Sequence, residues 1–199
     1  MGLGGGTMHA MPPAEPTVAM QVVTPELRKP AAELQPSEAL KEMLVEEEGV
    51  RHTVYRDVAG NPTVGVGHLV DATDGLRVGD RVGQDRILDF LEGDLREAKR
   101  AVARLTGNLP LSQHEFDALV DLVYNVGEGN LSERRSPRLN EAIAARDYDA
   151  IAEELGYHRA SGIEARGLVY RSERRAMVWA DGEYGDPRPA GTRQETRRA

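Results

Sequence analysis

The chain has 199 residues, of which 40% are hydrophobic and 29% are charged, a composition typical of one globular domain with a proper core. Its formal net charge of −8 and its pI of about 5.2 argue against a nucleic-acid partner and against adsorption to an anionic surface by bulk charge. It contains no Cys, which excludes a disulfide scaffold and a cysteine nucleophile, and no apolar run is long enough to cross a bilayer.

Residues 1–36 have the composition of a linker. They contain the runs GLGGG and PPAEP and no periodicity that could bury a face, so we expect a disordered or linker-like N-terminal segment. The segment also lacks a charged region followed by a continuous apolar region. We therefore expect neither a secretory signal nor an N-terminal membrane anchor.

An amphipathic helix is predicted to begin at the N-cap Ser37 and to end at Gly49. Its buried stripe starts with apolar side chains, namely Leu40, Met43 and Leu44. Four residues after the last two of these, the same face carries Glu47 and Glu48. A carboxylate, Glu48, is therefore expected at the last turn of this helix.

A β-hairpin is predicted next, with strands over 54–57 and 63–66. The sequence between them, Ala-Gly-Asn-Pro over 59–62, consists of residues that favour turns. Asp57 ends the first strand and Thr63 begins the second, so we expect the two to face each other.

This window resembles the signature of a known family. The positions that carry the match are Glu48-Gly49, Tyr55, Asp57, Gly60, Thr63 and Gly65-x-Gly67-His68. In this order and spacing they resemble the phage-type lysozymes, glycoside hydrolase family 24, which cut the glycan strands of bacterial peptidoglycan. The resemblance implies that Glu48 is the general acid, Asp57 the second carboxylate and Thr63 the hydroxyl that orients the attacking water. It extends over roughly residues 37–184.

Each feature alone has a common explanation without catalysis. A run of Glu at a helix end is usually solvated, an Asp before a tight turn usually caps its own backbone, and a Gly-rich strand often marks close packing. Gly65-Val66-Gly67 lacks the third Gly and the following helix of a phosphate-binding loop. A metal site on His52, Asp57 and His68 lacks the usual His-Glu-x-x-His helix. We therefore expect no metal and no cofactor.

Residues 69–83 are predicted to form a loop or a third short strand, followed by a long amphipathic helix over 87–105. The apolar positions of that helix are Ile87, Leu88, Leu91, Leu95, Ala98, Val102 and Leu105. In the resemblance this helix joins the two lobes of the fold. Asp94 on it matches the family position that pairs with His68, so we expect a structural ion pair that raises the pKa of the histidine.

Ser112 and Glu115 form a capping box that predicts the start of another helix, which ends at Asn125-Val126-Gly127. The resemblance places Leu69, Tyr124 and Asn125 at the substrate. For Tyr124 a plain core role is an equal alternative, because aromatic residues serve both uses.

Two short helices are predicted over 139–144 and 148–155. Gly167 to Arg171 matches the start of a family C-terminal motif whose next positions, Arg and Glu in the family, are Ser172 and Arg175 here. We expect this helix to survive with its ion pairs rearranged. Residues 186–199 are expected to be a basic tail of low order, which leaves 37–185 as the domain.

These observations predict a mostly helical α+β protein with a lysozyme-like fold, in which a long helix joins a small β-hairpin lobe to a helical lobe. The expected activity is inverting hydrolysis of the β-1,4 bond between N-acetylmuramic acid and N-acetylglucosamine. A non-catalytic virion or wall-binding protein that retains the fold is the alternative. The expected partner is peptidoglycan, with a holin or virion proteins as candidate delivery partners. A phage-encoded monomer, made in the host cytoplasm or carried in the virion, would act in the host periplasm.

Overall fold

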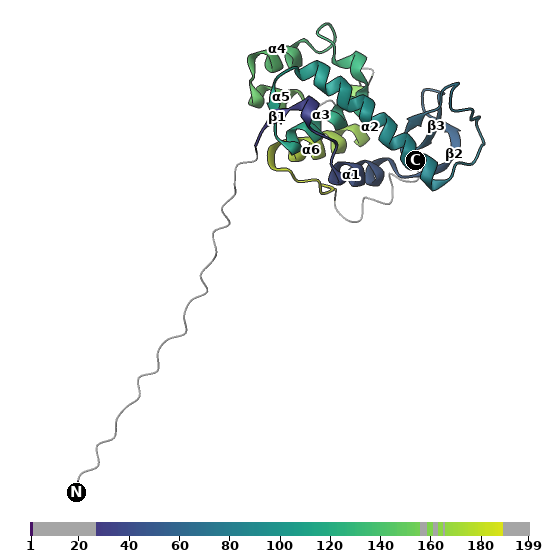
Figure 1. Cartoon of the computed structure of the whole chain (residues 1–199), viewed down its shortest axis with the longest axis horizontal. Coiled ribbons are helices and arrows are strands. Elements are labelled where there is room, and N and C mark those ends of the chain that lie inside the picture. Colours follow the sequence, from purple (N-terminus) through teal and green to yellow (C-terminus); the bar gives the residue numbers. More distant parts are fainter. Residues whose placement is uncertain (2–26, 156–158, 161–162, 165, 189–199) are drawn as a thin grey trace.

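The structure is a computed structural model that describes Met1 and residues 27–155, 159–160, 163–164 and 166–188. The long helix α2, Gln84–Thr106, runs from a lobe built on strands to a lobe built on helices (Figure 1). This arrangement confirms the predicted α+β class and the two lobes joined by one helix. Among the described residues, no helix is both long enough and apolar enough to span a membrane.

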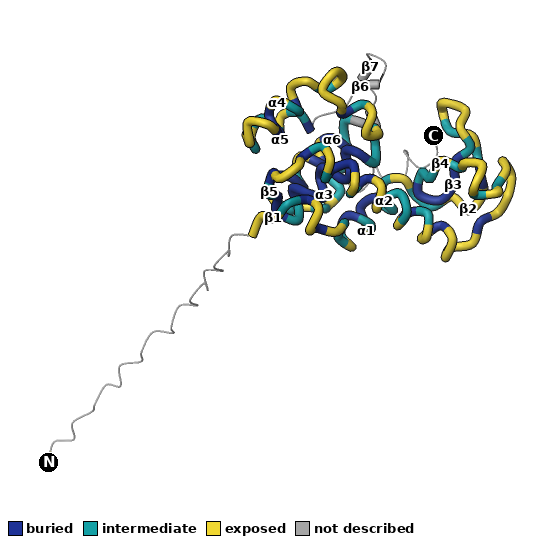
Figure 2. The backbone as a smooth tube through the Cα atoms, turned by 45° about the horizontal axis from the view of Figure 1, so that its top comes forward, coloured by how far each residue is buried: buried dark blue, intermediate teal, exposed yellow. Residues whose placement is uncertain are grey.

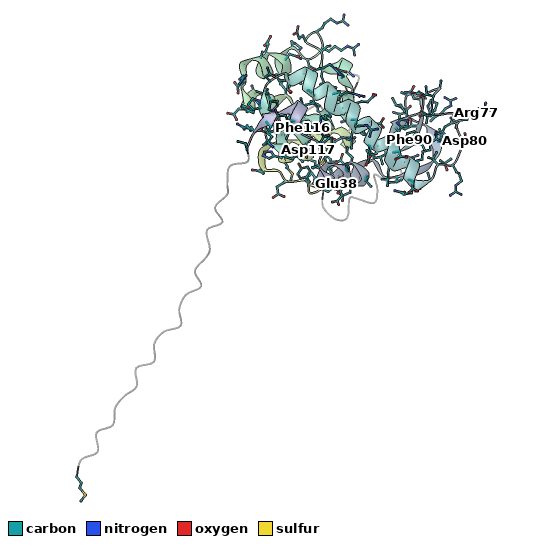
Figure 3. The ribbon with its side chains drawn as sticks, in the orientation of Figure 1. Glu38, Arg77, Asp80, Phe90, Phe116 and Asp117 are labelled. Carbon is teal, nitrogen blue, oxygen red and sulfur yellow. The ribbon has the colours of Figure 1, made fainter. Side chains whose placement is uncertain are left out.

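The small lobe is an antiparallel sheet with the strand order β2-β3-β4. Its strands are β2 Arg51–Arg56, β3 Pro62–Gly65 and β4 His68–Leu69. The loop before α2 covers the outer edge of β2, because Val54 N donates to Asp80 O over 2.9 Å and Val82 N donates to His52 O over 2.8 Å. Figure 3 places Asp80 at this outer edge and Phe90 on α2 beside the strands.

The register of the hairpin differs from the prediction. Tyr55, and not Asp57, lies opposite Thr63, and Arg56 lies opposite Pro62. The reason is that Asp57 belongs to the turn: its backbone N–H donates to Asn61 O over 2.9 Å.

The helices of the second lobe follow the predicted local signals. They are α1 Glu38–Glu48, α3 Gln113–Val126, α4 Pro137–Ala145, α5 Tyr148–Glu154 and α6 Arg166–Asp181, with the short 3-10 turns η1 Ala31–Glu33 and η2 Glu128–Leu131. Ser37 caps α1 through Leu40 N, and Ser112 and Glu115 form the full capping box of α3. A further strand pair, β6 Arg159–Ala160 and β7 Ile163–Glu164, precedes α6.

The core lies where α2, α3 and α6 meet, and Figure 2 shows the buried positions gathered along these helices. The buried apolar side chains of α2 are Ile87, Leu91, Leu95, Ala98, Ala101 and Val102. Leu88, which was expected in this stripe, is exposed because it lies one residue past Ile87 and so about 100° around the helix. On α3 even Asp117 and Asp121 are fully buried.

The packed domain begins earlier than residue 37. The strand β1, Lys29–Pro30, pairs with β5, Pro110–Leu111, and Ala31 is fully buried. Arg28 donates through Nε to Glu115 over 3.0 Å and its guanidinium lies 3.9 Å from the ring centre of Tyr148. Residues 28–34 are therefore part of the domain, which corrects the predicted linker at this end. The prediction for residues 2–26 lies outside the described residues.

The chain is also packed slightly beyond residue 185. Asp186 has a buried side chain that accepts from Arg188 Nη2 over 2.8 Å. Residues 189–199, the rest of the predicted tail, lie outside the described residues.

Candidate active site

Glu48, the last residue of α1, is held by a cation from α6. Arg171 of α6 donates through Nη1 to Glu48 Oε1 and through Nη2 to Asp121 Oδ1, the latter over 3.1 Å. Because Arg171 is itself buried, it has little freedom to move. The position of the Glu48 carboxylate is therefore set by α3 and α6.

Asp121 is the buried centre of this arrangement. Its second oxygen accepts from Arg175 Nε over 2.7 Å, and Arg175 also donates to Leu155 O over 3.0 Å. Burial alone would raise the pKa of Asp121, but the charges and hydrogen bonds of Arg175 and Arg171 hold it below its usual value. An ionised, fully buried carboxylate thus orients both arginines.

The three consecutive glutamates of α1 differ in environment. Glu47 has a side chain only 10% exposed, and burial raises its pKa, partly offset by Arg171 and Arg174. Glu46 pairs with Arg174 over 2.7 Å. The Glu48 side chain is 33% exposed, which makes it the member of the Glu47–Glu48 pair that is more accessible to a substrate.

Asp57 and Thr63 both take part in the bonding of the hairpin turn. Asp57 Oδ1 accepts from the backbone N–H of Asn61 and of Ala59 over 2.8 and 2.9 Å, and these bonds, that of Asn61 first, lower the pKa of the carboxyl. The hydroxyl of Thr63 is buried and donates to Asn61 O over 3.1 Å. The turn therefore holds an ionised carboxylate beside a fixed hydroxyl.

Tyr55 lies across the hairpin from one of the predicted catalytic residues. It is the cross-strand partner of Thr63, so the two side chains share a face of the sheet. Burial raises the pKa of the Tyr55 phenol. The guanidinium of Arg51, 4.3 Å from the ring centre, lowers this pKa, whereas the charges of Glu48 and Asp57 raise it.

A groove of about 860 Å³ runs along α2 between β4 and the end of α3. Leu69 and Tyr124, two of the predicted substrate contacts, line it, whereas Asn125, Glu48, Asp57 and Thr63 are not among its lining residues. The amide Nδ2 of Asn125 is instead buried and has no hydrogen-bond partner among the described residues. Of the predicted groups, Leu69 and Tyr124 therefore line the groove, whereas the three predicted catalytic residues lie outside its lining.

His68 and Asp94 lie in contact, as the ion-pair prediction requires. His68 Nδ1 is 3.0 Å from each carboxylate oxygen of Asp94, and the imidazole stacks on Phe90 at 4.0 Å. Nε2 lies 3.3 Å from Asp74, a contact that was not predicted. Burial alone would lower the pKa of His68, but Asp94 and Asp74 together raise it. The described part of the chain contains no group of three or more His, Cys, Asp or Glu residues that could hold a metal ion.

Asp121 is the functional residue that sequence reasoning missed. The sequence does contain a pattern that indicates its role: Asp117 and Asp121 are four residues apart and lie next to the apolar positions of α3. Two acids at helical spacing within a strongly apolar helix indicate buried partners, here the arginines of α6 and, for Asp117, the hydroxyl of Tyr184 at 2.7 Å.

A two-lobed α+β fold, with a glutamate at the end of α1 and an aspartate and a threonine in the hairpin that follows, is that of the lysozyme-like class. Residues 45–175 match the family model described as Phage lysozyme, and the chain belongs to this family. The endolysin of Salmonella phage P22 is 30% identical over 138 residues, which are 68% of this chain and 91% of that protein.

Solved structures agree on the fold. An endolysin from Escherichia coli O157:H7 phage FAHEc1 matches with a TM-score of 0.65 at 24% identity, over 77% of this chain and 98% of that one. A P22 lysozyme mutant matches with a TM-score of 0.60 at 26% identity, over 73% of this chain and 98% of that one. Family membership supports a lytic activity on peptidoglycan for this chain.

Proposed function

We propose that this protein is a phage muramidase that hydrolyses the β-1,4 bond between N-acetylmuramic acid and N-acetylglucosamine. The observation that carries the proposal is the placement of the positions that match the family: Arg171 holds Glu48 at the end of α1, and the turn of the hairpin fixes Asp57 and Thr63. Two carboxylates on either side of a scissile bond, with room for a water molecule, are what an inverting glycosidase requires.

In this mechanism Glu48 donates a proton to the glycosidic oxygen as the bond to the anomeric carbon breaks. Asp57 and Thr63 hold a water molecule on the opposite face of the sugar, and its oxygen attacks the anomeric carbon while its proton passes to Asp57. The amides of Asn61 and Ala59 lower the pKa of Asp57, so its carboxylate is ionised and can accept a hydrogen bond from the water molecule.

The groove along α2 would bind the flanking glycan. Leu69, which is 58% exposed, and the ring of Tyr124 offer apolar surface to sugar rings. Asn125 lies outside the groove and we do not place it at the substrate. We further propose that the enzyme serves host lysis or wall penetration in the host periplasm, released through a holin or carried by virion proteins.

The test is the release of new reducing ends from purified glycan strands by Glu48→Gln, with Glu47→Gln as the matched control. The Gln side chain keeps the volume but cannot donate the proton, so the rate with Glu48→Gln should fall by roughly a hundredfold to ten-thousandfold. If Glu48→Gln keeps full activity and Glu47→Gln loses it, the general acid is Glu47 and not Glu48. No activity in the wild-type protein would favour the non-catalytic alternative. NMR of the first-formed product anomer decides between inversion and retention.

A further inference from the structure

The two halves of the proposed catalytic apparatus are attached to different lobes. Glu48 is fixed to the helical lobe through Arg171 and Asp121, whereas Asp57 and Thr63 belong to the hairpin of the small lobe. The register and the turn fix the hairpin internally, but they do not fix its distance from Glu48. His68 ties the sheet to α2 through Asp94, and a contact between the sheet and α3, the helix that carries Asp121, would tie it to the support of Glu48 as well.

Tyr124 provides such a contact. Its hydroxyl donates to the backbone carbonyl of Val66, immediately after the strand β3 that begins with Pro62 and Thr63. Tyr124 lies three residues after Asp121 on α3, so the two side chains project from the same side of this helix. One turn of α3 therefore holds Glu48 through Asp121 and Arg171 and holds the hairpin through Tyr124.

The donor is present throughout the working pH range. Burial raises the pKa of the Tyr124 phenol, and the charges of Asp94 and Glu48 raise it further, so the hydroxyl keeps its proton. The neighbouring Gly67 has a positive φ of 90°, and a Cβ there would lie at an ordinary contact distance, 3.9 Å, from the Tyr124 oxygen. The phenol therefore packs against this turn.

We propose that Tyr124 is a positioning residue whose hydroxyl, by holding the carbonyl of Val66, sets the separation between Glu48 and the Asp57–Thr63 hairpin. The proposal rests on the muramidase function proposed above and adds to it a role for the hydroxyl that is separate from any stacking of the ring on a sugar. Without the hydroxyl, the Val66 carbonyl loses this donor and the hairpin loses its hydrogen bond to α3.

Tyr124→Phe tests this, because it removes the hydroxyl and keeps the ring. Tyr148→Phe is the matched control: the Tyr148 hydroxyl also donates to a backbone carbonyl, that of Pro110, but both residues lie in the helical lobe. Since the chain contains no Cys, spin labels at Val78→Cys in the small lobe and Glu141→Cys on α4 report the distance between the lobes without background labelling.

We expect Tyr124→Phe to broaden the distance distribution between the labels and to lower kcat roughly tenfold to a hundredfold, with a smaller change in KM, since misplacing a catalytic group by about 1 Å has an effect of this size. Tyr148→Phe should change neither quantity. An unchanged distance distribution in Tyr124→Phe overturns the proposal, whatever happens to the rate. A broadened distribution with unchanged kcat overturns it as well. If the wild-type protein cleaves no glycan, the muramidase function is lost, while the distances still decide whether the hydroxyl joins the lobes.

Discussion

Asp74 lies 3.3 Å from Nε2 of His68, on the side of the imidazole opposite Asp94. A neutral imidazole has one N–H and can donate to only one of the two carboxylates, whereas the protonated ring donates to both. Asp74 in turn accepts from the backbone N–H of Asp71 over 2.7 Å. The protonated histidine therefore fastens the loop after β4 to α2.

The first prediction concerns this contact and pH. The folded-state pKa of His68 is raised, so its contribution to stability is complete below the unfolded pKa of about 6.5 and is lost as the pH rises through the higher folded value. Asp74→Asn and Asp94→Asn should each lower the free energy of unfolding more near pH 5.5 than near pH 9. Urea unfolding at both pH values measures this, with Asp89→Asn on the same helix as control. If the free energy of unfolding falls equally at the two pH values, the charge of His68 does not contribute to stability.

The second prediction concerns the N-terminal strand. Removing residues 1–26 should leave the melting temperature nearly unchanged, whereas removing residues 1–34 should lower it markedly, because Ala31 is buried and β1 pairs with β5. Arg28→Ala alone should cost about 1–2 kcal/mol, since Glu115 then keeps its capping bond but loses its cation. Calorimetry of the two truncated chains measures their melting temperatures and so tests this prediction. If the protein lacking residues 1–34 is as stable as the full chain, residues 28–34 do not contribute to the stability of the domain.

Local signals in the sequence predicted the elements well. The caps at Ser37 and Ser112 and the break at Arg146-Asp147 depend on contacts within a few residues, and the structure has all three. The hairpin register was missed by contrast, because the carboxylate of Asp57 bonds the amides of the turn and so adds this residue to it. The hydrophobic pattern of the sequence does not indicate whether Asp57 belongs to the strand or to the turn.

The supporting contacts of the site could not be predicted for a different reason. Arg28 and Glu115 are 87 residues apart, and Arg171 and Asp121 are 50 apart, so no spacing rule joins them. The family resemblance includes Arg171 as a motif position but says nothing of its partners in this chain. What holds Glu48 in place depends on how α3 and α6 pack, which only the folded chain specifies.

The third prediction tests how closely the sheet packs on α2. Gly65 has φ of 66° and a Cβ there would lie 2.9 Å from Ile87 Cγ2, whereas Gly60 has φ of 88° and nothing within 4 Å. Gly65→Ala should therefore be destabilised by both backbone strain and a clash, by roughly 2–4 kcal/mol, and Gly60→Ala by strain alone, of about 1–2 kcal/mol. Thermal unfolding of the two variants gives the difference. Equal losses would mean that Ile87 moves aside at little cost.

The last prediction compares the two buried acids of α3. The pKa of Asp121 is lowered by Arg175 and Arg171 despite its burial, so its contribution to stability is present above the unfolded pKa of about 3.9 and is lost as the pH falls through the lower folded value. Asp121→Asn leaves the buried guanidinium of Arg175 without its anion and removes one of the anions of Arg171, so it should cost about 3–5 kcal/mol near pH 7, with a smaller loss in strong acid. Burial raises the pKa of Asp117 instead, so the folded state favours its protonated form and its charge lowers stability as the pH rises. Asp117→Asn should therefore cost less than Asp121→Asn near pH 7. Urea unfolding from pH 3 to pH 7 measures both variants, and equal losses near pH 7 would show that the arginines do not depend on the charge of Asp121.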